Sequence, residues 1–221
     1  MPVHARPRRR LLVLGAVLAA VACSPGEPGA SATSSPPSAS GSTTSVQDSG
    51  RREVAVFAGG CFWSVESNFE HMPGVVAAVS GFAGGQRVNP TYDQVVRGGT
   101  GHLEAVQVTF DPARISYRQL VDRFWRTIDP TDPAGQFCDR GASYGTAVFA
   151  TPAQKPAAEA SRRAAAAALA GKRFTTPVRD AGRFWPAEAH HQDFARRDPV
   201  RYGGYTRFCG RAARLRAVWG A

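Results

Sequence analysis

The pattern of hydrophobic and polar residues changes near residue 53 and predicts an ordered domain from there onward. Residues 53–58 (EVAVFA) are rich in β-branched and apolar side chains and end at two glycines, which predicts a strand followed by a tight turn. Phe62, Val65 and Phe69 then recur at helical spacing, so a helix is expected to begin near Cys61. Further strands are predicted at residues 75–79, 105–110 and 144–150.

Two later segments have the start signals of helices. Ser116 is a good N-cap for the amphipathic run SYRQLVDRFWRTI. Thr151 and Gln154 are spaced as a capped start for an alanine-rich helix that Gly171 is expected to end. Because strands and helices alternate along the chain, the pattern favours a mixed α/β layer architecture.

The first 22 residues have the organisation of a signal peptide. Four arginines precede a twelve-residue apolar segment, residues 11–22, and small and polar residues follow it. A helix of this length spans about 18 Å, whereas a hydrocarbon core is about 30 Å thick, so the segment is too short to cross a membrane. It ends in LAAVAC, which resembles the lipobox of bacterial lipoproteins, with Cys23 as the lipidated residue. Ordinary cleavage near Ala22 and a twin-arginine export signal are the alternatives.

Residues 23–52 predict a lipid-anchor cysteine followed by a tether. Ser, Thr, Pro and Gly fill 20 of the 27 positions from 24 to 50, and no aromatic residue occurs there, so this segment cannot bury a core. We therefore expect an exported protein, anchored to a membrane surface on its extracytoplasmic face. Its folded domain is expected to comprise residues 53–221.

Charge and cysteine content exclude several classes of protein. The chain of 221 residues has 27 Lys and Arg against 17 Asp and Glu, a formal net charge of +10, and part of this excess lies in the first 52 residues. The remainder has no basic stripe interleaved with aromatic side chains, so no nucleic-acid partner is expected. Four cysteines in a chain of this length exclude a disulfide-dense miniprotein.

Cys61 is the residue that points most directly to chemistry. It follows a predicted strand and two glycines and lies at the predicted first turn of a helix, where unpaired backbone N–H groups favour a thiolate over a thiol. We therefore expect a lowered thiol pKa. A buried cysteine acting as a small apolar side chain is the alternative. The neighbouring Phe62 and Trp63 favour an apolar cup beside the sulfur.

Four segments around this cysteine together resemble the A class of peptide methionine sulfoxide reductases. They are GCFWSVE, GFAGGQRVNPTY, GGTGHLEAV and FDPARISYRQL, which begin at residues 60, 81, 98 and 110. The resemblance extends from about residue 54 to 169 and continues more weakly to 194. It implies reduction of the S epimer of methionine sulfoxide, free or within oxidised proteins. It also implies a two-layer α/β (α+β) sandwich with a mixed β-sheet and flanking helices, which we expect to be a monomer.

The resemblance also implies roles for individual residues. Cys61 is the nucleophile that attacks the sulfoxide sulfur, and Glu104 is the acid that protonates the sulfoxide oxygen. Such an acid is worth about 10²–10⁴-fold in rate, and its pKa should be raised by burial or by a nearby thiolate. Two tyrosines hydrogen-bond the substrate oxygen, a carboxylate positions the substrate, and two aromatic side chains hold its methyl group. These residues are Tyr92, Tyr144, Asp139, Phe62 and Trp63.

A second thiol is needed after oxygen transfer, because a sulfenic acid on Cys61 condenses readily with a thiol. Cys209 is the favoured resolving residue, since it lies in a glycine-rich C-terminal segment of the kind that many family members keep mobile. Cys138 lies beside Asp139 and is the alternative, either as the direct partner or as a relay to Cys209. No bound cofactor or metal is expected, and thioredoxin or a thioredoxin-like dithiol is the implied reductant.

Some positions depart from the family pattern, and three alternative hypotheses remain open. Ser64 and the segment Ser143–Thr146 differ from the family around the pocket. A thiol hydrolase would pair Cys61 with a histidine, His102, His190 or His191. A zinc site would need Cys61, Cys138, Cys209 and His102, which lack close ligand pairs. A tethered lipoprotein that binds oxidised methionine without turnover is the non-catalytic alternative.

Overall fold

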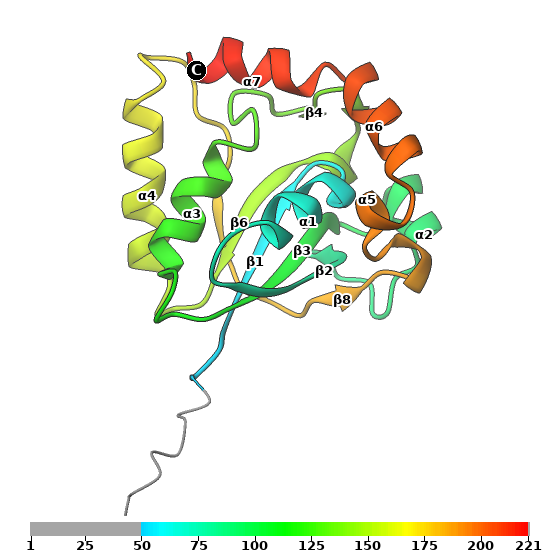
Figure 1. Ribbon diagram of the computed structural model, residues 1–221, viewed down its shortest axis with the longest axis horizontal. Coiled ribbons are helices and arrows are strands. Elements are labelled where there is room, and N and C mark those ends of the chain that lie inside the picture. The colour runs from blue at the N-terminus through cyan, green and yellow to red at the C-terminus, as the bar shows by residue number, and fades with distance from the viewer. Residues whose placement is uncertain (1–49, 221) are drawn as a thin grey trace, which may run out of the picture. The chain divides into compact units, whose positions relative to one another are not determined.

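The computed structural model describes residues 50–220, so the predicted signal peptide, Cys23 and the tether up to residue 49 lie outside the described residues. A six-stranded sheet in the order β7-β6-β1-β3-β2-β8 forms its centre (Figure 1). Its strands are β1 (Glu53–Gly59), β2 (Val75–Ala83), β3 (Leu103–Phe110), β6 (Thr146–Ala150), β7 (Val178–Asp180) and β8 (Trp185–Pro186). Only the β6–β7 pair among the described strands is parallel, which makes the sheet mixed.

The alternation of side chains along the strands separates the two faces of the sheet. Phe57, Val106 and Val148 belong to the large apolar cluster, whereas their neighbours Ala58, Ala105 and Ala147 belong to a smaller cluster on the opposite face. The helices α1 (Phe62–Glu70), α3 (Tyr117–Trp125) and α4 (Lys155–Ala167) contribute to the large cluster, as does Val95 of the short helix α2 (Tyr92–Arg97). The architecture is thus the expected α+β sandwich of a mixed sheet and flanking helices.

The sequence signals for the first helices are confirmed. Cys61 is the N-cap of α1, and Ser116 caps α3 in a reciprocal capping box with Gln119. Thr151 and Gln154 also exchange hydrogen bonds, but α4 begins only at Lys155 and ends at Ala167, before Gly171. The strand predicted from Tyr144 begins at Thr146, because residues Ala142–Tyr144 form a 3₁₀ turn.

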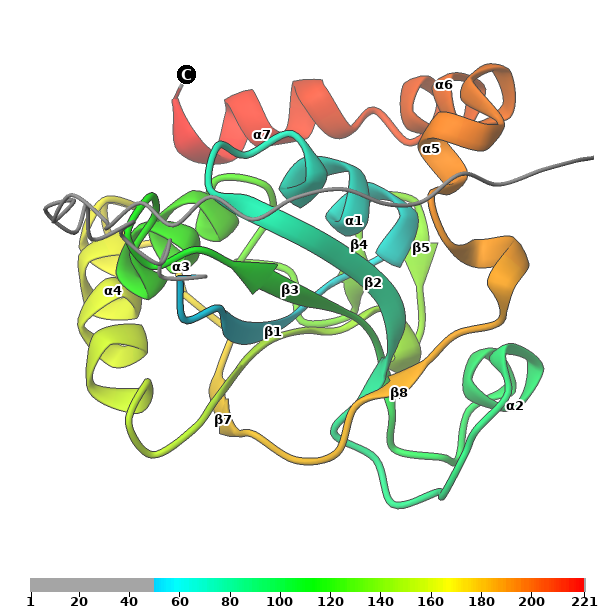
Figure 2. The same ribbon diagram turned by 60° about the horizontal axis from the view of Figure 1, so that its bottom comes forward.

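The last part of the chain is helical, which the sequence analysis did not anticipate. After a 3₁₀ turn at Ala189–His191 come α5 (Phe194–Arg197), α6 (Pro199–Phe208) and α7 (Arg211–Trp219). Figure 2 shows α1 between the sheet and the C-terminal helix α7. The Trp219 indole donates a 3.0 Å hydrogen bond to the Ile128 carbonyl and so fixes the end of α7. Within residues 50–220, no helix has the length and apolar character that crossing a bilayer requires.

Two short segments complete the framework around Cys61. The helix α2 (Tyr92–Arg97) begins with a capping box at Thr91, and the hairpin strands β4 (Gly135–Gln136) and β5 (Asp139–Arg140) precede the 3₁₀ turn. Gly60 connects β1 to α1 with φ +82°, a conformation that favours glycine. A Cβ atom at this position would lie 2.5 Å from the Cβ of Gln136, so the turn also needs the missing side chain.

Candidate active site

Cys61 lies at the junction of the central strand β1 and the helix α1, with 6% of its surface exposed. Its carbonyl accepts the first backbone hydrogen bonds of the helix, from Ser64 at 3.1 Å and Val65 at 3.4 Å. Among the described cysteines it is the free one, because Cys138 and Cys209 form a disulfide. The sequence prediction of a cysteine at the start of this helix is therefore confirmed.

The expectation that the pKa of Cys61 is lowered is wrong. Burial raises the pKa of the thiol to about 12, and the charge of the Glu104 carboxylate adds to this effect. A hydrogen bond with the Tyr205 hydroxyl acts in the opposite direction but does not outweigh them. The helix N-terminus cannot compensate for the loss of water around the sulfur, so Cys61 is a thiol in this state of the protein.

Glu104 is placed beside Cys61 by the pairing of the sheet. It lies on β3 opposite Phe82 of β2, is 1% exposed, and accepts a 3.0 Å hydrogen bond from the Phe62 backbone N–H. Burial raises its pKa to about 8, and the nearby Asp139 charge contributes in the same direction. Hydrogen bonds from Phe62 and from the Tyr144 hydroxyl limit the increase. The carboxyl group is therefore mostly protonated near pH 7, as the acid that the resemblance implies must be.

The two tyrosines implied by the resemblance meet at this carboxyl group. Tyr92 begins α2 and Tyr144 ends the 3₁₀ turn, and their hydroxyls lie close enough to affect each other's pKa. The backbone N–H of Tyr92 donates a 2.9 Å hydrogen bond to Glu188, which fixes the start of α2. Burial raises the pKa of both phenols, so both stay protonated and can donate hydrogen bonds to an oxygen atom.

Aromatic rings form the wall beside the sulfur. The Trp63 ring stacks on Phe194 of α5 with centroids 3.8 Å apart, and its indole N–H donates to His191 Nδ1 at 3.3 Å. The His191 ring lies 5.1 Å from Phe62 and 4.3 Å from Tyr92. Phe62 is buried, whereas Trp63 remains partly exposed and can meet a substrate. The sequence pattern gave no indication that Phe194 and His191 would hold these rings.

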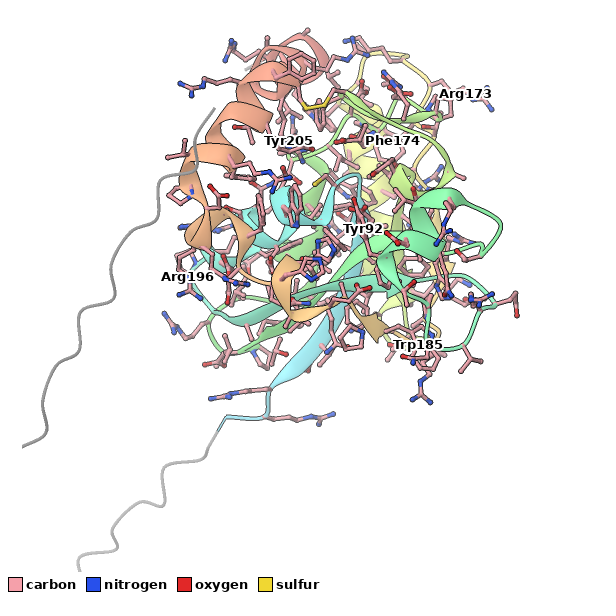
Figure 3. All side chains as sticks on the ribbon, turned by 90° about the vertical axis from the view of Figure 1, so that its right-hand side faces the viewer. Tyr92, Arg173, Phe174, Trp185, Arg196 and Tyr205 are labelled. Carbon is pink, nitrogen blue, oxygen red and sulfur yellow. A yellow bond between two sulfur atoms is a disulfide. The ribbon has the colours of Figure 1, made fainter. Side chains whose placement is uncertain are left out.

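Asp139 is close to the other predicted residues, but its carboxylate already has a partner. It accepts a 2.5 Å hydrogen bond from the hydroxyl of Tyr205, which lies on α6. Burial raises the pKa of Asp139, and the hydrogen bond from Tyr205 opposes this effect. Figure 3 shows Tyr205 and Tyr92 on the same side of the molecule, with the yellow disulfide bond beyond Tyr205. Tyr205 was not among the predicted site residues, and no spacing or motif in the sequence indicates it.

The two candidate resolving cysteines are bonded to each other. Cys138 is exposed in the hairpin between β4 and β5, and Cys209 is the C-cap of α6. Their Cα atoms are 4.8 Å apart. The glycine-rich segment that carries Cys209 is helical, because residues 199–208 and 211–219 form α6 and α7 and Gly203 and Gly204 lie inside α6.

The histidines and cysteines do not assemble the alternative sites. His102 accepts from the Gly85 N–H at 3.1 Å and donates to the Arg87 carbonyl at 2.8 Å, so both ring nitrogens serve the backbone. His191 Nδ1 accepts from Trp63. The sulfurs of Cys138 and Cys209 are bonded to each other, which leaves no pair of thiolates to join Cys61 and His102 at a zinc ion.

Comparisons with known proteins agree with this geometry. The family described as peptide methionine sulfoxide reductase matches residues 53–221. The chain is 49% identical over 180 residues to peptide methionine sulfoxide reductase MsrA 2 of Caulobacter vibrioides, covering 81% of this chain and 92% of that protein. It is 48% identical over 168 residues to MsrA 2 of Rhizobium meliloti, covering 76% and 84%.

Solved structures show the same fold. Methionine sulfoxide reductase A of Corynebacterium diphtheriae is similar with a TM-score of 0.59 at 33% identity, over 67% of this chain and 76% of that one. Reduced Mxr1 from Saccharomyces cerevisiae is similar with a TM-score of 0.64 at 26% identity, over 67% and 87%. Together with the family match over the whole folded domain, these similarities show that the chain belongs to the A class of peptide methionine sulfoxide reductases.

Proposed function

We propose that Cys61 and Glu104 carry out the reduction of the S epimer of methionine sulfoxide to methionine. One observation supports these roles. The buried, mostly protonated carboxyl group of Glu104 accepts a hydrogen bond from the backbone N–H of Phe62, the residue after Cys61. An acid in this place can protonate the oxygen of a sulfoxide whose sulfur faces Cys61. The hydroxyls of Tyr92 and Tyr144 would donate hydrogen bonds to the same oxygen, and Phe62 and Trp63 would hold the methyl group.

The first step moves one oxygen atom and two electrons. The Cys61 sulfur attacks the sulfoxide sulfur, Glu104 gives a proton to the oxygen, and the oxygen passes to Cys61 as the methionine leaves. Cys61 is oxidised from a thiol to a sulfenic acid, the sulfoxide is reduced to a thioether, and the thiol proton returns to Glu104. The raised pKa of Cys61 makes its thiol a weaker nucleophile. Protonation of the sulfoxide oxygen compensates for this, because it withdraws electrons from the substrate sulfur that Cys61 attacks.

The second step regenerates Cys61 through the other two cysteines. Cys209 attacks the Cys61 sulfenic acid, water leaves, and a Cys61–Cys209 disulfide forms. Cys138 then attacks Cys209, which releases the Cys61 thiol and leaves the Cys138–Cys209 disulfide. Tyr205 supports this order, because it lies beside Cys61 and is one helical turn before Cys209. A Cys138→Ser variant should therefore accumulate the Cys61–Cys209 disulfide, which peptide mapping by mass spectrometry would detect.

A thioredoxin or thioredoxin-like dithiol is the proposed reductant of the final disulfide. Cys138 is exposed, and a surface cavity of about 400 Å³ is lined by both Cys138 and Cys209. This cavity gives an external thiol a route to the disulfide without access to Cys61. Turnover with thioredoxin, thioredoxin reductase and NADPH, absent when thioredoxin is omitted, is the expected result.

The protein is further proposed to be exported and held on the extracytoplasmic face of a membrane by a lipid on Cys23. The support comes from the sequence alone: Cys23 directly follows a short apolar segment, and a Ser/Thr/Pro/Gly-rich tether comes after it. Incorporation of a labelled fatty acid into the protein, lost in Cys23→Ala, tests the anchor. Cleavage near Ala22 without fatty acid would contradict it.

The activity is tested with separate S and R epimers of N-acetyl methionine sulfoxide amide, with dithiothreitol as reductant. Conversion of the S epimer alone, lost in Cys61→Ser, is expected. No conversion of either epimer by protein whose Cys61 is free and reduced would contradict the proposed roles and favour binding without turnover.

A further inference from the structure

Tyr205 contacts two of the groups on which the proposed reaction depends. Its hydroxyl donates to Asp139 at 2.5 Å, and it lies close enough to Cys61 to affect the pKa of the thiol. Its ring meets Trp63 edge-on, with centroids 6.2 Å apart. A substrate sulfoxide must approach Cys61 and lie against Trp63, so Tyr205 occupies space that the substrate needs.

The disulfide fixes Tyr205 in this place. Tyr205 and Cys209 are four residues apart, so they lie on the same side of α6, one turn apart. Their partners Asp139 and Cys138 are adjacent residues of the hairpin. The hydrogen bond and the disulfide therefore form two neighbouring attachments between one turn of α6 and one end of the hairpin.

Among the described residues, α6 contributes no side chain to either apolar cluster. None of the ten residues of this described helix is buried, and Val200 and Phe208 are 84% and 87% exposed. The helices on either side are better anchored: Phe194 of α5 stacks on Trp63, and Val218 of α7 is buried. Between α6 and α7 the chain turns at Gly210, where φ is +60°. The helix α6 can therefore move when its attachments to the hairpin are released.

We propose that α6 is a redox-controlled lid in which the Cys138–Cys209 disulfide holds Tyr205 over Cys61 and Asp139 and excludes substrate until the disulfide is reduced. This inference rests on the proposed function. A closed site would protect Cys61 while the disulfide is present. If a second sulfoxide were reduced in that state, Cys61 would become a sulfenic acid with no thiol to resolve it. Such a sulfenic acid can be oxidised further to sulfinic acid, which is irreversible for most proteins.

The lid predicts how much methionine one enzyme molecule makes without a reductant. The first turnover converts one sulfoxide and two thiols, Cys138 and Cys209, into one methionine, one water and the disulfide. Cys61 is a thiol again at that point and has the electrons for a second methionine. An open site would therefore yield two methionines for each enzyme molecule, whereas a closed site yields one.

The test uses the full-length protein in its reduced state. The reductant is removed anaerobically, and the protein is then mixed with an excess of the S sulfoxide of N-acetyl methionine amide. The wild-type protein is expected to release one methionine product per molecule, and Tyr205→Ala is expected to release two. The second product must leave a sulfenic acid on Cys61, which a dimedone adduct identifies. Tyr202→Phe, a change at a neighbouring tyrosine of α6, is the matched control and should release one.

A second measurement does not depend on the substrate. Alkylation of Cys61 by iodoacetamide, followed by peptide mapping, is expected to be about tenfold slower in the disulfide state than in the reduced state, because the hydrogen bond between Tyr205 and Asp139 must open first. Tyr205→Phe, which keeps the ring and loses the hydrogen bond to Asp139, should reduce this difference. Tyr205→Phe also replaces Tyr205→Ala if the alanine variant does not fold.

Two results would overturn the lid. One is that the wild-type protein releases a second methionine product as fast as the first. The other is that Cys61 is alkylated at the same rate in both redox states. A protein that makes no product even with excess dithiothreitol would contradict the proposed function instead, and the alkylation rates would still decide whether the lid exists.

Discussion

The carboxyl group of Glu104 accepts a hydrogen bond from the backbone N–H of Phe62, so the proposed acid is attached to the first turn of the helix that Cys61 caps. Glu104 comes from the central part of the sheet, and its partner lies 42 residues earlier in the chain. A shift of β3 in its pairing by one residue would point Glu104 to the other face of the sheet. The sheet register therefore decides whether acid and nucleophile meet.

The protonation of Glu104 predicts the alkaline limit of activity. Its folded-state pKa is raised to about 8, so the acid form dominates below that pH and is lost as pH rises through it. The maximal rate with the S sulfoxide should therefore fall above about pH 8. Glu104→Gln should lower the rate by about 10²–10⁴-fold and remove this pH dependence. Persistence of the same alkaline fall in Glu104→Gln would assign it to another group.

The two tyrosines should affect this limit differently. Tyr144 donates a hydrogen bond to the Glu104 carboxylate and thereby lowers its pKa. Tyr144→Phe should raise the pKa of Glu104 and move the alkaline fall to higher pH, while the maximal rate drops. Tyr92→Phe is the matched change, because no hydrogen bond from Tyr92 lowers the pKa of Glu104. Pre-steady-state rates from pH 6 to 10 would separate the two, and an equal shift in both variants would contradict the assignment.

Gly60 should tolerate no side chain. Gly60→Ala places a Cβ at φ +82° and 2.5 Å from the Cβ of Gln136, whereas Gly98→Ala at φ +86° meets nothing within 4 Å. Strain alone costs about 1–3 kcal/mol, and the contact adds a similar amount at Gly60. Urea unfolding should therefore show a larger loss of free energy of unfolding for Gly60→Ala than for Gly98→Ala. Equal losses would mean that Gln136 moves aside freely.

The ion pair of Asp129 and Arg214 should stabilise the fold at neutral pH and lose its effect in acid. Their charged atoms are 2.6 Å apart, and the Asp129 side chain is 2% exposed. Burial alone would raise the pKa of Asp129, but hydrogen bonds from Thr131 and Arg214 outweigh it and lower the pKa. A lowered pKa stabilises the folded state above the unfolded value of about 3.9, and this stabilisation disappears as pH falls through the folded value.

Asp129→Asn should accordingly lower the free energy of unfolding by about 1–3 kcal/mol at pH 7. The difference from the wild type should shrink below about pH 4. Asp93→Asn is the comparison, since the Asp93–Arg97 pair is 80% and 75% exposed and should contribute less than about 0.5 kcal/mol. A loss that stays constant from pH 7 to pH 3 would show that the charge of Asp129 is not responsible.

Local signals in the sequence determined the elements that position the nucleophile. The apolar run before Gly59–Gly60, the helical spacing after Cys61 and the Ser116 N-cap depend on neighbouring residues, and each appears in the structure where it was predicted. The resemblance to a reductase family rests on the same short segments, and the structure groups the residues it named, Glu104, Tyr92, Tyr144 and Asp139, near one another. Their chemical roles remain predictions.

Tertiary structure alone decided the protonation of Cys61 and the position of Tyr205. The sequence places the thiol at a helix N-terminus, which by itself lowers a pKa, but burial and the Glu104 charge reverse the direction. Tyr205 reaches the site because α6 folds back onto the hairpin of Cys138, across 66 residues of chain from Asp139. Burial and contacts between distant segments have no period or local spacing, so the linear pattern of residues cannot reveal them.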